Sequence, residues 1–310
     1  MSTAELSARA AGPAPRQAAF NDDRLWRWTT FSPALALMLL LSVLPLVNLF
    51  ATSFQDVTWA GGQAVRESVG LAHYRALPTD PLFRAGLWNT LIFAIVAVAG
   101  QMVLGLFLAV LCSKITRGKV FYRAVFILPI LIPGIVIGAI WKLMLNFDFG
   151  LVNGGLSLLG IPPHDWLGAS ETALLSVILV DIWHWTPFCF LLCLAGIEGL
   201  PQDVSEASRI DGASAWQEFR FITFPLLIPT LIVTFAFRLV LAFKVFDEVF
   251  LLTGGGPGTA TEVVSFTLYQ RFFTEDRVGY GSAMSVAVIF FVSLLLVIAM
   301  ASQRRSAAAA

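Results

Sequence analysis

The chain has 310 residues, of which 57% are hydrophobic and only 13% are charged. A soluble domain usually carries about 25% charged residues, so this composition excludes a large soluble core and indicates a protein embedded in a membrane. The formal net charge is zero, which gives no global field that would attract nucleic acid or acidic partners.

Six apolar segments are long enough to cross a bilayer as helices, because a hydrocarbon core of about 30 Å needs about 20 residues per span. The fifth segment has a polar start and is interrupted by charged residues. We therefore predict an all-α membrane protein with six transmembrane helices. The segments are Phe31–Phe54, Ala85–Ser113, Ala124–Leu145, Thr172–Ile197, Phe221–Leu252 and Ser282–Ser302.

A polar tail, residues 1–30, precedes the first apolar segment, and residues 303–310 form a second tail. We predict that the first tail is flexible and that residues 31–302 form one transmembrane domain. The first apolar segment resembles the core of a signal peptide, and Ala51-Thr52-Ser53 loosely resembles a cleavage site. Because the segment is too long for a signal peptide, we interpret it as a retained anchor.

Lysine and arginine residues set the expected orientation of the spans, since they are enriched on the cytoplasmic side. A cytoplasmic N-terminus places most of them inside, so we predict that both termini and the connection Glu198–Arg220 are cytoplasmic. The inside set is Arg9, Arg16, Arg24, Arg27, Lys114, Arg117, Lys119, Arg123, Arg209, Arg220, Arg304 and Arg305, and the outside set is Arg66, Arg75, Arg84, Arg271 and Arg277.

Several functional classes lack their sequence motifs. No Gly-x-x-x-x-Gly-Lys-Ser/Thr loop occurs in the sequence, so if ATP drives this protein, it binds to another chain. No internal repeat is evident, which disfavours a secondary carrier built from paired halves. Cys189 and Cys193 are one helical turn apart, a spacing that suits a metal pair. Because no further ligand lies nearby, we interpret them, with Cys112, as residues of the membrane core.

Residues 199–220 are predicted to form a short helix, a turn and a second helix. Pro201 suits a first helical turn. Gly212 ends the helix because glycine adopts the left-handed conformation without steric cost. Ser214 and Gln217 fit a capping box that starts the second helix. The first helix has an apolar stripe and either docks on a partner or lies on lipid. The stripe consists of Val204, Ala207 and Ile210.

The same segment carries a longer pattern. The string Glu206-Ala207-Ser208-x-x-Asp211-Gly212-Ala213, followed by Phe219, Ile222, Pro225 and Pro229, resembles the EAA loop of bacterial binding-protein-dependent ABC importer permeases. Ser208 replaces a more usual alanine, and Phe224 replaces a leucine. In that family the loop, here residues 199–225, forms coupling helices that insert into the ATPase subunit. The resemblance implies that Glu206 faces the ATPase, that Gly212 makes the turn, and that coupling involves Glu206, Ala207, Ser208, Asp211, Gly212 and Ala213.

A second stretch narrows the resemblance to carbohydrate permeases of the maltose and glycerol-phosphate type. It is Phe243-Lys244-Val245-Phe246-Asp247 with Leu252–Gly258 and Thr261-Glu262, supported by Arg117-Gly118-Lys119, Tyr122-Arg123, Pro129 and Pro133. The resemblance covers roughly residues 30–302. It implies a type I ABC importer permease fold in the bacterial cytoplasmic membrane and the import of a sugar or sugar derivative rather than an enzymatic activity.

The resemblance also implies a set of partners. These are a second permease subunit, two ATPase subunits that bind ATP and magnesium, and an extracytoplasmic solute-binding protein that delivers the sugar. The chain itself is expected to contact membrane lipid and to have no catalytic residue, metal site, cofactor or nucleic-acid partner.

Ionisable side chains inside a span cost at least about 2.5–3.5 kcal/mol on insertion scales, so each needs a role. Asp181, His184 and Trp185 share one face of the fourth span, and Arg238 lies in the fifth. Indole rings stack on sugars while carboxylates and imidazoles bond to hydroxyls, which indicates a translocation site. The alternative is an Asp181–Arg238 ion pair that only joins two helices. The resemblance implies a pathway of Ile130, Gly134, Asp181, His184, Trp185, Arg238, Ala242 and Val245.

Arg238 is the most unusual of these residues, because small polar side chains are commoner at this position in the family. A guanidinium suits bidentate capture of a carboxylate, phosphate or sulfonate, so an anionic sugar derivative is one hypothesis for the substrate. Neutralisation of Arg238 by Asp181 is the competing interpretation. Lys244 and Asp247, three residues apart, are expected to pair and to serve packing or gating.

Two other functions compete with the importer. An ion-driven carrier acting without an ATPase would use Asp181 and His184 as a proton relay. An intramembrane enzyme would use them in acid–base chemistry, but the sequence offers no evident nucleophile or metal set. Uptake by this chain alone would favour the carrier, whereas co-purification with an ATPase and a second permease would favour the importer.

Overall fold

The computed structural model describes residues 19–115 and 117–308. The chain divides into two units, residues 1–52 and 53–310, and each is considered by itself. Five helices in the described residues are long and apolar enough to cross a membrane, and one bent pair of helices gives a sixth candidate. This confirms the predicted helical protein, and the predicted six spans are reached if the bent pair forms one of them.

The first unit is the helix α2, Ala19–Thr52, which includes the candidate span Trp26–Thr52. Within this unit the span packs against no other element, and its most apolar window has a mean hydropathy of 2.4. The predicted flexible tail is helical from residue 19 to residue 30, and its residues 1–18 lie outside the described residues.

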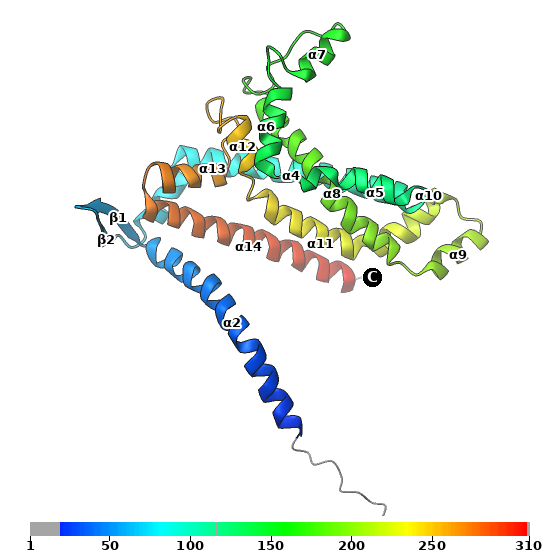
Figure 1. The fold of residues 1–310 in the computed structure, drawn as a ribbon, viewed down its shortest axis with the longest axis horizontal. Coiled ribbons are helices and arrows are strands. Elements are labelled where there is room, and N and C mark those ends of the chain that lie inside the picture. Colours follow the sequence, from blue (N-terminus) through cyan, green and yellow to red (C-terminus); the bar gives the residue numbers. More distant parts are fainter. Residues whose placement is uncertain (1–18, 116, 309–310) are drawn as a thin grey trace, which may run out of the picture. The chain divides into compact units, whose positions relative to one another are not determined.

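The second unit is built on four long helices, α4, α8, α11 and α14 (Figure 1). Helices α4 and α8 pack against each other most extensively, and α11 lies against both of them and against α14. Phe93, Val177 and Val249 are completely buried in the apolar core between these elements. The helices are α4 Pro81–Ser113, α8 Ala173–Glu198, α11 Phe224–Ala242 and α14 Val278–Ala308.

Glycine permits the close contact between α4 and α8. A Cβ atom on Gly105 would lie 2.6 Å from Cys189 Cβ and 2.8 Å from the Phe190 amide nitrogen. Because backbone atoms cannot move aside cheaply, we expect Gly105→Ala to destabilise the protein by about 1–3 kcal/mol. The thermal unfolding midpoint in detergent would measure this loss. Gly155→Ala is the control, because no atom lies within 4 Å of its added Cβ. Equal midpoints for the two variants would contradict the expected tight packing.

Two predicted spans are interrupted rather than continuous. Helix α5, Lys119–Ile127, is followed by the 3₁₀ turn η2, Leu128–Leu131, and by α6, Gly134–Met144, at a bend of 92°. Pro129 and Pro133 explain this break, since proline lacks the amide hydrogen that an α-helix needs. The predicted segment Ala124–Leu145 is therefore a candidate span broken near its prolines rather than one continuous helix.

The predicted fifth segment, Phe221–Leu252, was wrong at its end. Helix α11 stops at Ala242, residues 243–246 leave the helix, and the short α12 covers Asp247–Leu252. Helix α12 packs on α6, where a Cβ on Gly138 would lie 2.8 Å from Leu251 Cβ. The halves of two broken spans thus form one packed pair.

The long helices of the second unit separate two ends (Figure 1). One end, called the hairpin end, carries a β-hairpin of β1 and β2, in which Thr58 pairs with Val65 across Gly61-Gly62. The other end, called the α9 end, carries α9 and α10, and α10 continues through the π-helical turn η3 into α11. The hairpin was not predicted. The remaining elements are β1 Gln55–Ala60, β2 Gln63–Ser68, α3 Ala72–Ala76, η1 Leu77–Thr79, α7 Leu151–Leu158, α9 Gln202–Ile210, α10 Ala215–Glu218, η3 Phe219–Thr223, α13 Val264–Tyr269 and η4 Gln270–Thr274.

Candidate functional site

A buried polar network joins α4, α8 and α11. The Arg238 guanidinium donates to Asp181 Oδ2 at 2.7 Å and, through Nε, to Gln101 Oε1 at 2.6 Å. The Gln101 amide donates in turn to Asp181 Oδ2 at 2.7 Å and to the Asp181 carbonyl at 3.0 Å. All three side chains are at most 2% exposed. A charge this deeply buried requires such partners, so the network is a condition for these groups to lie inside the span.

Two further contacts extend the network. The Arg238 guanidinium carbon lies 4.7 Å from the centre of the Trp185 ring, a cation–π contact worth about 2 kcal/mol when desolvated. His184 Nδ1 lies 3.0 Å from Glu248 Oε1, and both side chains are buried. The His184–Glu248 contact connects α8 to α12 and therefore ties the helix bundle to the broken fifth span.

A cavity of about 200 Å³ lies beside this network, where the breaks of both interrupted spans meet. Helix α6 contributes its first residue, α8 contributes three polar or aromatic residues, and the break between α11 and α12 closes the wall. Two larger hollows, of about 410 and 510 Å³, lie elsewhere and include none of the network residues. The cavity is lined by Gly134, Asp181, His184, Trp185, Leu241, Lys244, Val245, Phe246, Asp247 and Glu248.

The structure brings most of the predicted pathway residues together. Five of them, Gly134, Asp181, His184, Trp185 and Val245, line the cavity. Arg238 and Ala242 are buried behind it at 1% exposure each. Ile130 lies in the turn η2 and does not line the cavity.

Lys244 and Asp247 both line the cavity with exposed side chains. No ion pair joins them in the described part of the chain, so the predicted pairing of these two residues is absent there. The helix break between them explains this, because the i, i+3 geometry exists only on a continuous helix.

Gln101 is the network residue that the sequence prediction missed. It is neutral and lies within a long apolar segment, so a search for charged groups passes over it. An amide side chain in such a segment is itself a signal, because it requires hydrogen-bond partners away from water. Among the described residues, no group of three or more His, Cys, Asp and Glu side chains is arranged to hold a metal ion.

The predicted helix–turn–helix at the α9 end is present. Helix α9 ends in a Schellman turn, in which Gly212 has φ +77° and the Ala213 amide donates to the Ser208 carbonyl at 3.0 Å. Ser214 and Gln217 form the predicted capping box at the start of α10. Ser205 Oγ also donates to Glu218 Oε1 at 2.5 Å, which links α9 to α10. Turn, cap and cross-link together hold α9 in a fixed direction.

The apolar stripe of α9, which was predicted to dock on a partner or to lie on lipid, is exposed. Ile210 is 87% exposed and Val204 is 39% exposed. Glu206, Ala207, Asp211 and Gly212 are exposed, Ala213 is half-buried and Ser208 is buried at 6%. A short helix with an exposed apolar stripe needs a partner or lipid to cover it.

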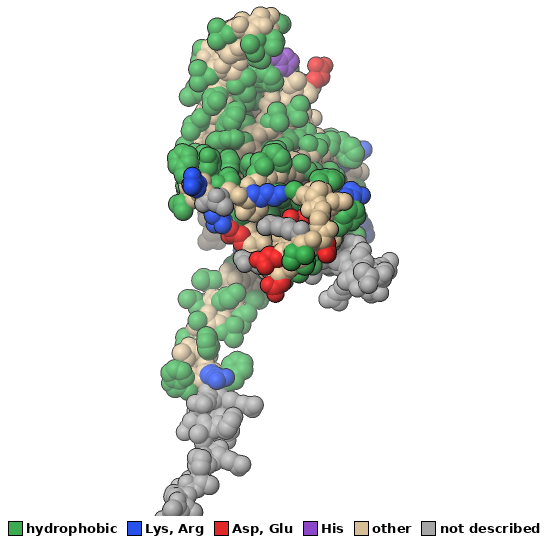
Figure 2. Space-filling model, turned by 90° about the vertical axis from the view of Figure 1, so that its right-hand side faces the viewer, with side chains coloured by type: hydrophobic (Ala, Val, Ile, Leu, Met, Phe, Trp, Pro, Cys, Tyr) green, Lys and Arg blue, Asp and Glu red, His purple; other side chains and the backbone are tan. Residues whose placement is uncertain are grey.

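Figure 2 faces the α9 end and shows basic and acidic side chains gathered there. Lys119 Nζ lies 2.6 Å from Glu198 Oε1, and Arg123 pairs with the same carboxylate. These ion pairs tie α5 to the end of α8, directly before the segment that leads into α9. The charged rim marks this end as a surface for water or a polar partner rather than for hydrocarbon.

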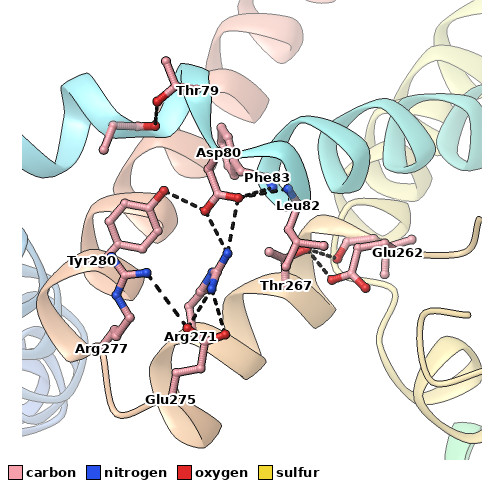
Figure 3. Close-up of polar contacts among 12 residues, drawn as sticks. Thr79, Asp80, Leu82, Phe83, Glu262, Thr267, Arg271, Glu275, Arg277 and Tyr280 are labelled. Atoms are coloured by element: carbon pink, nitrogen blue, oxygen red, sulfur yellow. Dashed lines mark hydrogen bonds and ion pairs between the residues drawn. The ribbon is translucent and has the colours of Figure 1, made fainter. Parts of the chain in front are cut away.

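A second charged cluster lies at the hairpin end (Figure 3). Arg271 contacts the Asp80 carboxylate at 3.1 Å and the Glu275 carboxylate at 2.7 Å. The Tyr280 hydroxyl donates to Asp80 Oδ2 at 2.9 Å, and the Arg277 guanidinium carbon lies 4.4 Å from the Tyr280 ring centre. Asp80 also caps α4. The cluster therefore fastens the start of α4 to η4 and to the start of α14.

Asp80 should make the stability of this end depend on pH. Burial raises the pKa of Asp80, but hydrogen bonds from Tyr280 and two backbone amides, with the charge of Arg271, outweigh burial and leave the pKa below its usual range. Such a carboxylate stabilises the fold above the unfolded pKa of about 3.9, and this contribution is lost as the pH falls through the folded-state value.

We therefore expect Asp80→Asn to lower the thermal unfolding midpoint at neutral pH, with the difference from wild type shrinking below about pH 4. Midpoints measured in detergent across this pH range would check the effect. Asp148→Asn, at an exposed carboxylate outside the cluster, is the control. A difference that stays constant with pH would show that the Asp80 charge does not stabilise this end.

Comparison with known proteins shows which proteins this chain resembles. Residues 101–309 match the family described as binding-protein-dependent transport system inner membrane component. The chain is 37% identical over 261 residues to the trehalose/maltose transport system permease protein MalF of Thermococcus litoralis. The aligned residues cover 84% of this chain and 87% of that protein. It is 33% identical over 272 residues, or 88% of each chain, to the sulfoquinovosyl glycerol transport system permease protein SmoG of Agrobacterium fabrum.

Solved structures support the fold. A bacterial ABC transporter involved in the import of the acidic polysaccharide alginate contains a chain that matches with a TM-score of 0.80 and 23% identity, covering 94% of this chain and 99% of that chain. The alginate transporter in complex with its alginate pentasaccharide-bound periplasmic protein matches with a TM-score of 0.81 and 22% identity. At this identity the likeness extends to the fold alone.

Proposed function

Because this chain belongs to the family of binding-protein-dependent transport system inner membrane components, we propose that it forms the translocation pathway of an ATP-driven importer for a sugar or sugar derivative. Membership makes the chain a multi-pass permease subunit of the bacterial inner membrane and not an enzyme. The trehalose/maltose and sulfoquinovosyl glycerol permeases among its relatives support a sugar-type substrate.

The observation that carries the proposal is the geometry of α9. An exposed apolar stripe and the exposed Glu206 are held in a fixed direction by the Gly212 turn and the α10 cap. In this proposal α9 is the coupling helix, which inserts into a separate ATPase subunit. A rigid element transmits force better than a flexible loop, since little of the ATPase movement is lost in bending.

The proposed sugar site is the 200 Å³ cavity. Asp181 and His184 supply hydrogen-bonding groups and Trp185 supplies a ring for stacking on a sugar face. The hypothesis of an anionic substrate rested on Arg238, whose Nε and one terminal nitrogen are engaged by Gln101 and Asp181. This geometry favours neutralisation of Arg238, so we propose a substrate selected by its hydroxyl groups and ring faces rather than by an acidic group.

The proposed assembly contains a second permease subunit, two ATPase subunits that hold ATP and magnesium, and an extracytoplasmic solute-binding protein. With both termini in the cytoplasm, the α9 end faces the ATPases and the hairpin end faces the binding protein. ATP binding would close the ATPases and draw the coupling helices together, and rigid-body movement of the permeases would then turn the cavity outward.

Purification of the full chain from its native membrane tests this function. The importer predicts that ATPase and second-permease subunits co-purify, and that a sugar-loaded binding protein stimulates ATP hydrolysis by the complex. Sugar uptake by vesicles that contain this chain alone, driven by an ion gradient, would overturn the proposal in favour of a secondary carrier.

A further inference from the structure

We propose that Gln101 and Arg238 are positioning residues of the sugar site, which hold Asp181 and Trp185 in their binding orientation without touching the sugar. This inference rests on the proposed function and deepens it. In this inference the buried residues Gln101 and Arg238 shape the sugar site and do not recognise the sugar directly.

Neither positioning residue reaches the cavity. Gln101 is 0% exposed and Arg238 is 1% exposed, and neither of them lines the cavity. Their two partners do line it. The network therefore has an inner layer that contacts only protein and an outer layer that faces the cavity.

The hydrogen bonds divide the Asp181 carboxylate between these layers. Its Oδ2 atom accepts from both Gln101 and Arg238. Its Oδ1 atom accepts no hydrogen bond from a described residue, and it is absent from the fully buried side-chain atoms that lack a partner in that part of the chain. One oxygen is thus fixed from behind, which orients the other toward the cavity as an acceptor for a sugar hydroxyl.

Trp185 is fixed in a similar way. The guanidinium of Arg238 covers one face of its ring at 4.7 Å, while the half-buried indole also lines the cavity. A planar cation held by Gln101 and Asp181 cannot rotate freely, so it restrains the tilt of the ring together with His184 and Phe188, whose ring centres lie 5.2 and 6.2 Å from that of Trp185. The part of the ring that lines the cavity is the surface on which a sugar would stack.

The spectroscopic test uses the full-length chain purified with its accompanying subunits and labelled with 5-fluorotryptophan. Comparison with Trp185→Phe assigns the Trp185 fluorine signal. We expect Gln101→Met and Arg238→Met to shift or broaden this signal. Arg238→Lys keeps the charge beside Asp181 but not the planar face, so it should also move the signal and serves if the methionine variants fail to fold. An unchanged signal in the folded variants would overturn the proposal.

The matched control is Thr234→Val, one helical turn from Arg238 on α11. Thr234 is 0% exposed, and its hydroxyl donates to the Thr230 carbonyl of its own helix. The control should lower stability without moving the Trp185 signal. A shift equal to that of Arg238→Lys would mean that any disturbance of α11 reaches the ring, which contradicts a specific positioning role.

Transport of labelled maltose and trehalose as neutral probes, and of glucuronate as an acidic probe, separates positioning from direct contact. Positioning predicts that Arg238→Lys and Gln101→Met reduce uptake of every transported probe by a similar factor, about tenfold. Selective loss of glucuronate uptake in Arg238→Lys would overturn it, because only a direct contact distinguishes the acid. If wild type takes up none of the probes and no ATPase subunit co-purifies with it, the proposed function fails, and the fluorine signal still decides the positioning.

Discussion

Replacing Gly212 with proline is expected to abolish sugar uptake while the chain still inserts into the membrane and the ATPase subunits still hydrolyse ATP. Gly212 has φ +77°, whereas proline fixes φ near −65°, so the turn that ends α9 cannot form. The proposed coupling helix α9 would then point in another direction and would no longer follow the ATPase movement. We expect uptake by reconstituted vesicles to fall by at least about tenfold per ATP hydrolysed.

Two further variants separate the turn from the side chains around it. Gly212→Asn should retain most uptake, because asparagine tolerates the left-handed conformation and nothing lies within 4 Å of the added Cβ. Glu206→Lys leaves the backbone intact and reverses an exposed charge, so it should uncouple as Gly212→Pro does. Normal uptake in both Gly212→Pro and Glu206→Lys would count against docking through this helix.

Removing Arg238 alone should give the largest loss of stability. Arg238→Met leaves the Asp181 carboxylate buried at 2% exposure with Gln101 as its remaining side-chain partner. Breaking a buried ion pair in this way typically costs about 3–5 kcal/mol, because an uncompensated charge stays in a medium of low polarity. Unfolding of the purified protein in a denaturing detergent would measure the loss.

The double variant Asp181→Leu with Arg238→Met removes both charges together. We expect it to recover most of the stability lost in Arg238→Met, since two apolar side chains can replace a buried pair at little net cost. The Gln101 Oε1 atom, which loses its donor Arg238, should account for the remaining deficit, and adding Gln101→Leu should relieve it. A double variant no more stable than Arg238→Met would show that the charges themselves do not cause the loss.

The segment of α9 and α10 was predictable from the sequence because its signals are local. The turn at Gly212 and the capping box of Ser214 and Gln217 each depend on residues a few positions apart. The structure confirms both features. The exposure of the apolar stripe also follows from the length of α9, since a helix of nine residues outside the bundle has no core to enter.

The interruptions of the spans were harder to predict. Pro129 and Pro133 are local signals for the first break. A hydropathy profile alone, however, shows one continuous apolar segment across them. Residues 243–246, Phe-Lys-Val-Phe, contain neither proline nor glycine, and the second break follows from packing of α12 on α6. Only the nearby charges, Lys244, Asp247 and Glu248, marked the region as unusual.

Pairing between distant segments was beyond sequence reasoning. Gln101 and Arg238 form a hydrogen bond although they are 137 positions apart in the sequence. The residues next to either of them contain no pattern that predicts this partner. The β-hairpin is a different case, because Gly61-Gly62 between two alternating segments is a recognisable two-residue turn. Its six-residue strands are short and largely polar, so a search for apolar spans passes over them.

The interruptions in the two spans also bear on how readily the protein can cycle. A continuous helix forced to kink at every turnover would have to break its own backbone hydrogen bonds each time. Residues 128–133 and 243–246 already lie outside regular α-helix, beside the walls of the cavity. In the proposed importer, both spans can therefore bend at breaks that already lie beside the cavity, without breaking further helical hydrogen bonds.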